Sequence, residues 1–302
     1  MMKVLISDKL ADEGVQKLKD AGLEVNCAWD IPKDELPNII GEYDGLIVRS
    51  ATQVRGSLIE NGKNLKVIGR AGIGLDNIDL DKAKEMGIVV RNTPTATSIT
   101  VAELALTFLM VCSRDVIAGT NTLRAGEWAK KELSKGTEVY GKTLGIVGFG
   151  RIGHELAKRA MGLGMRVLAY RRNPKPVEGV EFVPLDKLLA ESDYISLHVP
   201  LTDESKHMIS TEQFNRMKKG VCLLDVGRGG VVDLDALYDA IKGGIVKKAA
   251  LDVFEVEPPG KHKLFELDHV IGTPHIGAAT DEGQLRAGIL VAEAVIEELK
   301  KL

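Results

Sequence analysis

A glycine-rich turn between residues 144 and 153 places the strongest constraint on how this chain can fold. An apolar run over residues 144–147 ends at Gly148, and Gly150 and Gly153 complete the spacing G-x-G-x-x-G. A helical pattern of apolar residues follows over 152–163, and a second apolar run spans 165–170. A strand, a tight turn, a helix and a strand in this order form the context in which the spacing predicts a dinucleotide site.

Each glycine of this turn has a physical task. Gly148 allows the tight turn, Gly150 leaves room for a pyrophosphate beside the backbone, and Gly153 lets the helix pack closely on the strand. The N-terminus of the helix that follows offers free N–H groups and its positive dipole end to the phosphates. We therefore expect a nicotinamide or flavin dinucleotide here, and the alternative is a glycine turn with a structural role alone.

Strand and helix patterns alternate along most of the chain. The first third predicts strands at 3–7, 23–28, 45–48, 65–68 and 88–90, with helices at 11–21, 33–40 and 80–86. A second set predicts six strands near 144–148, 167–170, 194–199, 222–226, 249–253 and 270–272. Such alternation is typical of parallel sheets covered on both faces. The sequence predicts an α/β protein with two doubly wound parallel-sheet domains, the second a Rossmann domain.

Two helical patterns mark the domain boundaries. Residues 98–123 form one long pattern that is apolar nearly all round, which is typical of a helix buried between domains or subunits. Residues 281–301 form a closing helix that could return to the first domain. We expect a discontinuous substrate domain of residues 1–97 plus 282–302, and a dinucleotide-binding domain of residues 98–281. A capping box at Ser210 and Gln213 and an N-cap at Asp233 begin two of its helices.

Composition narrows the possible partners. The 302 residues carry a formal charge of −3, and their Lys and Arg residues are dispersed. This gives no reason to expect nucleic-acid or membrane binding. Three scattered cysteines have no metal-like spacing, so no metal is expected, and they suit a reducing compartment such as the cytoplasm.

Three predicted loops after strands of the second domain carry residues suited to hydride transfer. Arg228, Glu257 and His275 each follow a different strand. A histidine can take the proton of an alcohol near neutral pH, and a carboxylate beside it fixes its tautomer. A guanidinium can hold a carboxylate through forked donors. His198 is the alternative base, and we interpret it as structural. In the first domain, the loops 49–52 and 71–74 also follow strands, where ligands bind in such sheets.

Several stretches together resemble the D-isomer-specific 2-hydroxyacid dehydrogenases, especially the branch that oxidises 3-phosphoglycerate. The matching stretches are Ile47–Thr52, Gly69–Asp79, Asn92–Pro94, Gly141–Gly145, the glycine motif, Arg228–Gly230, Ala250–Phe254 and Pro274–Ala278. They cover nearly the whole chain. The resemblance implies two α/β domains with the active site in the cleft, a short form without a C-terminal regulatory domain, and a homodimer.

The resemblance also implies roles for individual residues. His275 resembles the general acid/base, Glu257 its carboxylate partner and Arg228 the substrate-orienting arginine. The implied substrate contacts are Arg49 for a phosphate and Gly72, Ile73 and Gly74 for a carboxylate. Because hydroxyl groups beside a guanidinium suit a phosphate, we expect Ser50 and Thr52 to contact it as well, with Lys130 and Lys131 as further candidates. The expected cofactor contacts are Gly148, Gly150, Arg151, Ile152, Gly153, Arg171, Val199, Val226, Asp252, Gly277 and Ala278.

Two departures from the family pattern affect the expected site. Asp225 stands where the family often has Asn, which puts the local hydrogen bonding of the Arg228 loop in doubt. Arg171 and Arg172 stand where an NAD enzyme carries an acid, and arginines there suit the 2′-phosphate of NADP. We expect NAD as the cofactor, with NADP also possible.

The expected function is the conversion of 3-phosphoglycerate to 3-phosphohydroxypyruvate in serine biosynthesis. The first alternative is a glyoxylate or hydroxypyruvate reductase that uses the same residues. An alternative from another class is a dinucleotide-sensing, corepressor-like interaction protein.

Overall fold

The computed structural model describes residues 1–301 and divides them into two compact units. The first unit comprises residues 1–98 together with the segment from Ala278 onward, and the second comprises residues 99–277. These boundaries differ from the predicted ones by one residue and by four residues. The larger difference arises because the short segment before the closing helix, with its N-cap Thr280, belongs to the first unit.

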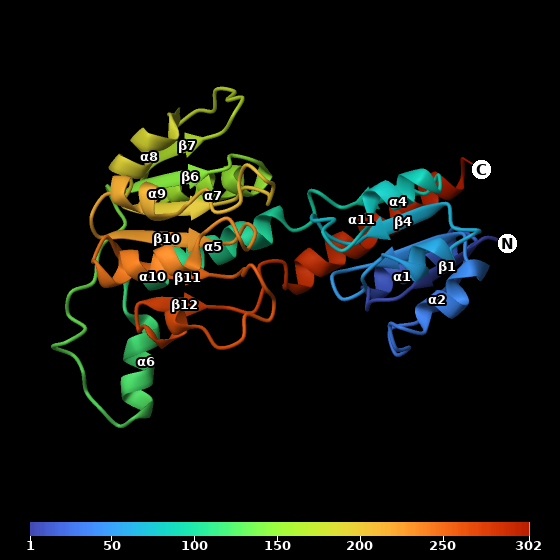
Figure 1. The fold of residues 1–302 in the computed structure, drawn as a ribbon, viewed down its shortest axis with the longest axis horizontal. Coiled ribbons are helices and arrows are strands. Elements are labelled where there is room, and N and C mark those ends of the chain that lie inside the picture. The colour runs from blue at the N-terminus through green and yellow to red at the C-terminus, as the bar shows by residue number, and fades with distance from the viewer. Residues whose placement is uncertain (302) are drawn as a thin grey trace. The chain divides into compact units, whose positions relative to one another are not determined.

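The first unit is a five-stranded parallel sheet with helices on both faces (Figure 1). Its strands are β1 (Lys3–Ile6), β2 (Glu24–Cys27), β3 (Gly45–Val48), β4 (Val67–Arg70) and β5 (Val89–Asn92), in the order β2-β1-β3-β4-β5. One face packs against α1 (Asp12–Asp20) and α11 (Asp281–Leu299). The other packs against α2 (Leu36–Ile39), α3 (Ser57–Glu60) and α4 (Leu80–Glu85). The order reverses between β1 and β3, so ligands are expected beyond these two strands.

The closing helix α11 packs into the core of the first unit. It crosses α1 at Gly14 and Gly288, where a Cβ on Gly14 would lie 2.6 Å from the Gly288 carbonyl oxygen. Val291 and Val295 cover Gly69 of β4, where a Cβ would lie 2.7 Å from each valine. The close approach of helix to helix and of helix to strand therefore depends on glycine at these positions.

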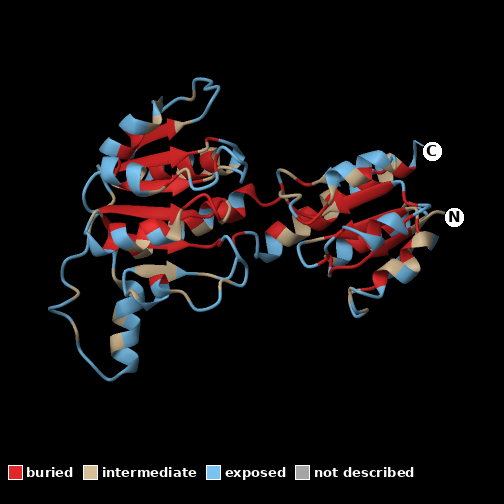
Figure 2. Cartoon of the chain, viewed as in Figure 1, coloured by how far each residue is buried: buried red, intermediate tan, exposed pale blue. Residues whose placement is uncertain are grey.

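The second unit is a seven-stranded parallel sheet in the order β12-β11-β10-β9-β6-β7-β8. Its strands are β6 (Thr143–Val147), β7 (Arg166–Tyr170), β8 (Val180–Phe182), β9 (Tyr194–Leu197), β10 (Val221–Asp225), β11 (Val246–Leu251) and β12 (Val270–Gly272). One face packs against α5 (Ser98–Ser113) and α7 (Arg151–Gly162). The other packs against α8 (Leu185–Glu191), α9 (Thr211–Arg216) and α10 (Leu234–Lys242). Figure 2 shows the buried strands between helices with exposed outer faces.

This architecture confirms the predicted fold class, and the strand order reverses between β6 and β9. The capping box at Ser210 and Gln213 and the N-cap at Asp233 are also present as predicted. Within residues 1–301, no helix combines the length and the apolar character that crossing a bilayer requires.

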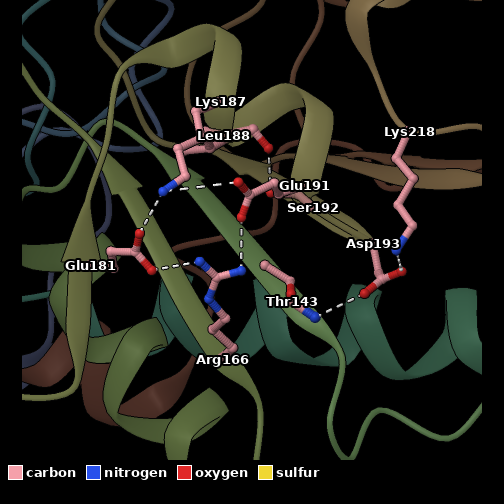
Figure 3. Close-up of polar contacts among 9 residues, drawn as sticks. All are labelled: Thr143, Arg166, Glu181, Lys187, Leu188, Glu191, Ser192, Asp193 and Lys218. Atoms are coloured by element: carbon pink, nitrogen blue, oxygen red, sulfur yellow. Dashed lines mark hydrogen bonds and ion pairs between the residues drawn. The ribbon is translucent and has the colours of Figure 1, made fainter.

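Strand β8 is an edge strand that the sequence analysis did not predict. It has three residues and pairs in parallel with β7, and its Val180 also forms an isolated antiparallel bridge with Val177. Charged side chains tie it to its surroundings: Arg166 of β7 contacts Glu181 of β8 at 2.5 Å and Glu191 of α8 at 2.8 Å (Figure 3). Lys187 of α8 also contacts Glu181, at 2.8 Å. Because these side chains are exposed, each pair contributes little to stability, and the network mainly fixes where the edge lies.

The prediction of one continuous buried helix over 98–123 is wrong. Helix α5 ends at Ser113, whose hydroxyl contacts the Tyr194 hydroxyl at 2.8 Å, and a separate helix α6 (Val116–Arg124) follows. Asp115 at the break forms an ion pair with the buried Lys248 of β11. Helix α6, all of which the structure describes, has no buried residue. The apolar pattern therefore reflects core packing in α5 and an exposed apolar surface in α6.

Candidate functional site

The glycine turn has the geometry that a pyrophosphate requires. Gly148 has φ of +93°, and a Cβ there would lie 2.7 Å from the backbone of His198. A Cβ on Gly153 would lie 3.0 Å from the Gly148 carbonyl oxygen, whereas one on Gly150 would meet nothing within 4 Å. Gly150 caps the twelve-residue helix α7, so Arg151 and Ile152 contribute its first N–H groups. The turn therefore leaves open space beside Gly150, at a helix N-terminus, where an anion can bind.

A pocket of about 540 Å³ lies at this turn, where the strand order reverses. Four of the predicted cofactor contacts line it: Gly148, Gly150, Arg171 and Val199. Further lining residues that the sequence analysis missed come from the loop after β9: Thr202, Glu204, Ser205 and Met208. The available signal was the position of this loop, because it follows the strand beside β6 at the reversal.

Two arginines line the pocket beyond the end of β7. The Arg171 guanidinium donates a hydrogen bond to the Phe149 carbonyl oxygen at 3.1 Å, which holds it against the glycine turn. Arg172 contacts the carboxylate of Glu204 at 3.0 Å, and both side chains are more than three-quarters exposed. The pocket therefore does contain an acid, Glu204 from the loop after β9, and it contacts Arg172.

Glu257 and His275 come together from the loops after β11 and β12. Glu257 Oε2 lies 2.7 Å from His275 Nδ1, and Glu257 Oε1 accepts a hydrogen bond from the Phe254 N–H at 3.0 Å. The His275 backbone has φ of +52°, and its N–H donates to the Asp252 carbonyl oxygen at 3.0 Å. The carboxylate faces Nδ1, so Nε2 is the nitrogen that can exchange a proton with a substrate.

Asp252 holds the loop that carries His275. Its carboxylate accepts hydrogen bonds from the Thr273 hydroxyl at 2.6 Å, from the Ile276 N–H at 2.8 Å and from the Gly277 N–H at 2.7 Å. The residue is 1% exposed. Two predicted cofactor contacts, Asp252 and Gly277, are therefore bonded to each other.

The last two of the predicted cofactor contacts lie elsewhere. Val226 is buried after β10, and Ala278 belongs to the first unit.

Arg228 lies on the loop after β10, and its guanidinium donates to the Gly227 carbonyl oxygen at 2.8 Å. The next residue, Gly229, has backbone contact with the Glu257 loop, because a Cβ there would lie 1.9 Å from the Phe254 carbonyl group. This contact joins the arginine loop to the loop of the carboxylate. All three predicted catalytic residues lie in the second unit, on loops after neighbouring strands.

Asp225, which stands where the family often has Asn, keeps the hydrogen bonding of the Arg228 loop. Its Oδ1 accepts a hydrogen bond from the Gly227 N–H at 2.9 Å, so the turn before Arg228 is closed by the carboxylate. Burial raises the pKa of Asp225 to about 7, although the Gly227 hydrogen bond and the charge of Arg228 oppose this shift.

We expect Asp225→Asn to stabilise the protein at neutral and alkaline pH. The amide oxygen can keep the bond to Gly227, whereas the wild-type carboxyl must ionise in a buried position. Because its pKa rises to about 7 from an ordinary value of 3.8, wild-type stability is lost as the pH rises through this window. The gain in the free energy of unfolding should reach up to about 4 kcal/mol above pH 7 and vanish near pH 4. Urea unfolding of both proteins across this range measures it, and a gain independent of pH would contradict the assignment.

His198, the alternative base, lies at the end of β9. One ring nitrogen contacts the Ser196 hydroxyl at 2.9 Å, and Nδ1 is enclosed without a hydrogen-bond partner among the described residues. Burial lowers the pKa of His198 to about 3. A histidine in this environment stays neutral and is poorly suited to exchange protons with a substrate.

The predicted substrate residues lie in the first unit, on loops after the neighbouring strands β3 and β4. The Asp8 carboxylate organises the 49–52 loop, which includes Ser50, by accepting from the Arg49 N–H at 2.7 Å and the Thr52 hydroxyl at 2.7 Å. Burial alone would raise the pKa of Asp8, but the bonds from Thr52, Arg49 and Lys33 hold it below its ordinary value. Asp8 was not predicted, although it follows β1 at the reversal of the sheet.

The 72–74 loop is held from β5. Gly72 has φ of +150° and accepts from the Thr93 N–H at 2.9 Å, and the Asn92 amide donates to the Ile73 carbonyl oxygen at 2.6 Å. Gly74 completes this loop. The carbonyl groups of Gly72 and Ile73 are thus occupied by bonds within the unit.

Comparison with known proteins gives consistent results. The sequence model of the NAD-binding domain of D-isomer specific 2-hydroxyacid dehydrogenases matches residues 106–277. A hydroxypyruvate reductase of Thermotoga maritima is 51% identical over 98% of each chain. A D-3-phosphoglycerate dehydrogenase of Methanocaldococcus jannaschii is 46% identical over 99% of this chain, which spans 58% of that relative's length. The crystal structure of D-lactate dehydrogenase from Aquifex aeolicus, complexed with NAD and lactic acid, is 31% identical, covers 99% and 96% of the two chains and superposes with a TM-score of 0.83.

Proposed function

This chain belongs to the D-isomer specific 2-hydroxyacid dehydrogenase family, and from this membership we propose its substrate and the roles of its residues. It is an NAD-dependent enzyme that transfers hydride between the cofactor and a 2-hydroxy acid. The observation that carries the catalytic proposal is the contact of 2.7 Å between Glu257 and His275. NAD supplies the hydride acceptor, and the chain supplies the proton acceptor and the groups that orient the substrate.

In the oxidation direction, we propose that His275 Nε2 takes the proton of the substrate hydroxyl as hydride leaves the same carbon. Glu257 fixes Nδ1 as the protonated nitrogen in the neutral ring and stabilises the imidazolium that forms. Arg228 holds the substrate carboxylate through its forked donors. In the reverse direction, His275 returns its proton to the carbonyl oxygen.

For the substrate, we propose 3-phosphoglycerate and its oxidation product, with the phosphate bound near Arg49. A guanidinium beside hydroxyl groups suits a phosphate. A second candidate is hydroxypyruvate, which is 3-phosphohydroxypyruvate without its phosphate. The 51% identity to the hydroxypyruvate reductase of Thermotoga maritima favours this substrate. A third alternative, a corepressor-like interaction protein, gains no support from the relatives described above, which are named as dehydrogenases or reductases.

The decisive experiment is a panel of 2-oxo acids assayed with NADH and with NADPH. Phosphohydroxypyruvate, hydroxypyruvate and glyoxylate should be compared by kcat/KM. The highest value for phosphohydroxypyruvate would support the first proposal, and the highest value for hydroxypyruvate or glyoxylate would support the reductase. No turnover of any 2-oxo acid would contradict both.

Arg49→Ala should raise KM for phosphohydroxypyruvate about tenfold or more and change KM for hydroxypyruvate little. The reason is that a charge-assisted hydrogen bond to a phosphate contributes about 1.5–3 kcal/mol. Its guanidinium also donates to the Lys9 carbonyl oxygen at 3.2 Å and to Gln284 at 3.3 Å, so a thermal melt should accompany the kinetics. Arg55→Ala, which removes another guanidinium of the same unit, is the matched control. Equal losses on both substrates would rule out the phosphate role of Arg49.

For the oligomeric state, we propose a homodimer that covers α6 and the segment after it. Val116, Ile117, Leu123 and Trp128 are exposed there, and Trp128 is 78% exposed. A cavity of about 330 Å³ lies between α6 and residues 128–133. Apolar surface gathered in this way is typical of an interface. Leu123→Glu should halve the mass measured by light scattering, and a monomeric wild type at micromolar concentration would contradict the proposal.

A further inference from the structure

The loop that carries Glu257 also carries Glu255, which pairs with a second histidine, His207, from the segment after β9. Glu255 Oε2 lies 3.0 Å from His207 Nε2, two residues before the carboxylate that contacts His275. His207 and His275 have φ of +49° and +52° and are the two non-glycine residues with positive φ among those that the structure describes. A histidine adopts this conformation rarely, and it persists where surrounding contacts hold it. The backbone is therefore held in place at His207 and at His275, and both side chains contact the loop that carries Glu255 and Glu257.

The contact between His207 and Glu255 is supported by neighbouring residues. Glu255 Oε1 lies 3.3 Å from the Lys206 ammonium group, so the carboxylate is bound by two successive residues. The hydrogen bond from His207 holds the pKa of Glu255 below its ordinary value, outweighing its partial burial. The His207 N–H donates to the Gly230 carbonyl oxygen at 2.7 Å, and Ile209 continues this pairing at Val231. The segment 206–209 is thus joined to the Arg228 loop by its backbone and to the Glu257 loop by its side chains.

Contacts lead from this anchor to the proposed catalytic pair. The Phe254 carbonyl group packs against Gly229 so closely that a Cβ would lie 1.9 Å away. On its other side, the Phe254 N–H donates to Glu257 Oε1 at 3.0 Å, and Glu257 Oε2 reaches His275. Residues 254–255 therefore lie between two supports, Gly229 and the Lys206–His207 segment, and provide the hydrogen bond that orients Glu257.

The same segment continues from the cofactor pocket. Glu204 and Ser205 line the pocket immediately before Lys206, and Met208 lines it immediately after His207. The Ser205 hydroxyl donates to the Pro200 carbonyl oxygen at 2.6 Å, which closes the loop into a compact turn. One short segment thus lines the pocket with Glu204, Ser205 and Met208 and holds the Glu257 loop with the two residues between them, Lys206 and His207.

We propose that His207 and Glu255 are positioning residues that hold Glu257 against His275. The inference rests on the proposed function, in which Glu257 and His275 form the catalytic pair. Exposed ion pairs contribute little to stability, and His207 and Glu255 are 40% and 42% exposed. Breaking the pair should therefore change the orientation of Glu257 more than it changes unfolding.

The test compares two variants that change charge in opposite directions. Glu255→Gln removes a negative charge, and the double variant Lys206→Met/His207→Asn removes a positive one, with asparagine chosen because it tolerates positive φ. If the pair positions Glu257, both variants weaken the contact between Glu257 and His275. Because a nearby anion favours the imidazolium, the titration of His275, followed by NMR of labelled protein, should move to lower pH in both. Glu257→Gln is the positive control and should move it in the same direction.

A purely electrostatic effect gives a different pattern. Glu255→Gln would then move the His275 titration to lower pH and the double variant would move it to higher pH. A structural role alone would lower the thermal midpoint and leave the titration unchanged. Either pattern overturns the proposal. Glu212→Gln, which breaks the exposed contact with Arg216 on α9, is the matched control and should leave the titration unchanged.

Kinetics provide the second measurement. Both variants should lower kcat/KM about tenfold, in keeping with the effect of small misplacements of catalytic groups, and the limb of the pH profile that follows His275 should move to lower pH. The failure of the proposed function is distinguishable. If His275→Ala keeps its turnover, the catalytic assignment is wrong, whereas the NMR titration still reports whether the second pair positions Glu257.

Discussion

Replacing His275 with alanine should lower kcat about a hundred- to ten-thousandfold and leave the affinity for NADH nearly unchanged. General acid–base catalysis is worth about this factor, because the proton is transferred in the transition state. The dinucleotide turn lies on the loop after β6, whereas His275 follows β12 at the far edge of the same sheet. Steady-state kinetics with the preferred 2-oxo acid and fluorescence titration with NADH measure the two quantities separately.

The control for this variant is His198→Ala. His198 is half-buried and lines the pocket at the glycine turn, and burial of its ring lowers its pKa to about 3, so its loss should affect stability or cofactor binding before it affects proton transfer. The assignment of the base is wrong if His275→Ala keeps near-normal turnover and His198→Ala does not.

Arg171→Asp should change the ratio of kcat/KM for NADPH over NADH about tenfold to a hundredfold in favour of NADH. We propose that the enzyme accepts NADP in addition to NAD, because the Arg171 guanidinium lines the pocket where the 2′-phosphate would lie. A charge-assisted hydrogen bond is worth about 1.5–3 kcal/mol, which corresponds to this ratio, and an aspartate adds repulsion. Initial rates with both cofactors at saturating 2-oxo acid give the two values.

Arg172→Ala separates the two arginines. Arg172 contacts Glu204, so part of its charge is already balanced, and its loss should change the ratio less than the loss of Arg171. A wild type that does not use NADPH, together with unchanged NADH kinetics in Arg171→Asp, would show that this position does not select the cofactor.

The sequence predicted those parts of the site where both the residue type and its position after a strand indicate the same function. Gly148 and Gly153 have no room for a side chain, and Gly150 keeps open space at the helix N-terminus, so their spacing predicts the turn. Glu257 and His275 follow strands of a parallel sheet, and such strands end at one edge. Their contact could be anticipated from topology, although its distance could not.

Other features depend on contacts between distant residues. Strand β8 is too short for a periodic pattern, and it is fixed by charged side chains from β7 and α8. The break between α5 and α6 lies where Asp115 meets Lys248, which is 133 residues away. Asp8 follows β1 but contacts Arg49 after β3, and Glu204 follows β9 but contacts Arg172 after β7. No local pattern around these residues reveals such partners.

The position of α11 in the first unit has a consequence for the order in which the chain matures. The second unit is continuous from 99 to 277, so its whole sequence has been synthesised before the ribosome reaches α11. Until that helix emerges, the face of the first sheet around Gly69 lacks Val291 and Val295, and α1 lacks the glycine against which Gly14 packs. Domains generally fold as units, and those nearest the N-terminus generally fold first. Here the unit that is begun first is completed last, and its nascent sheet keeps an apolar face exposed while the second unit is made.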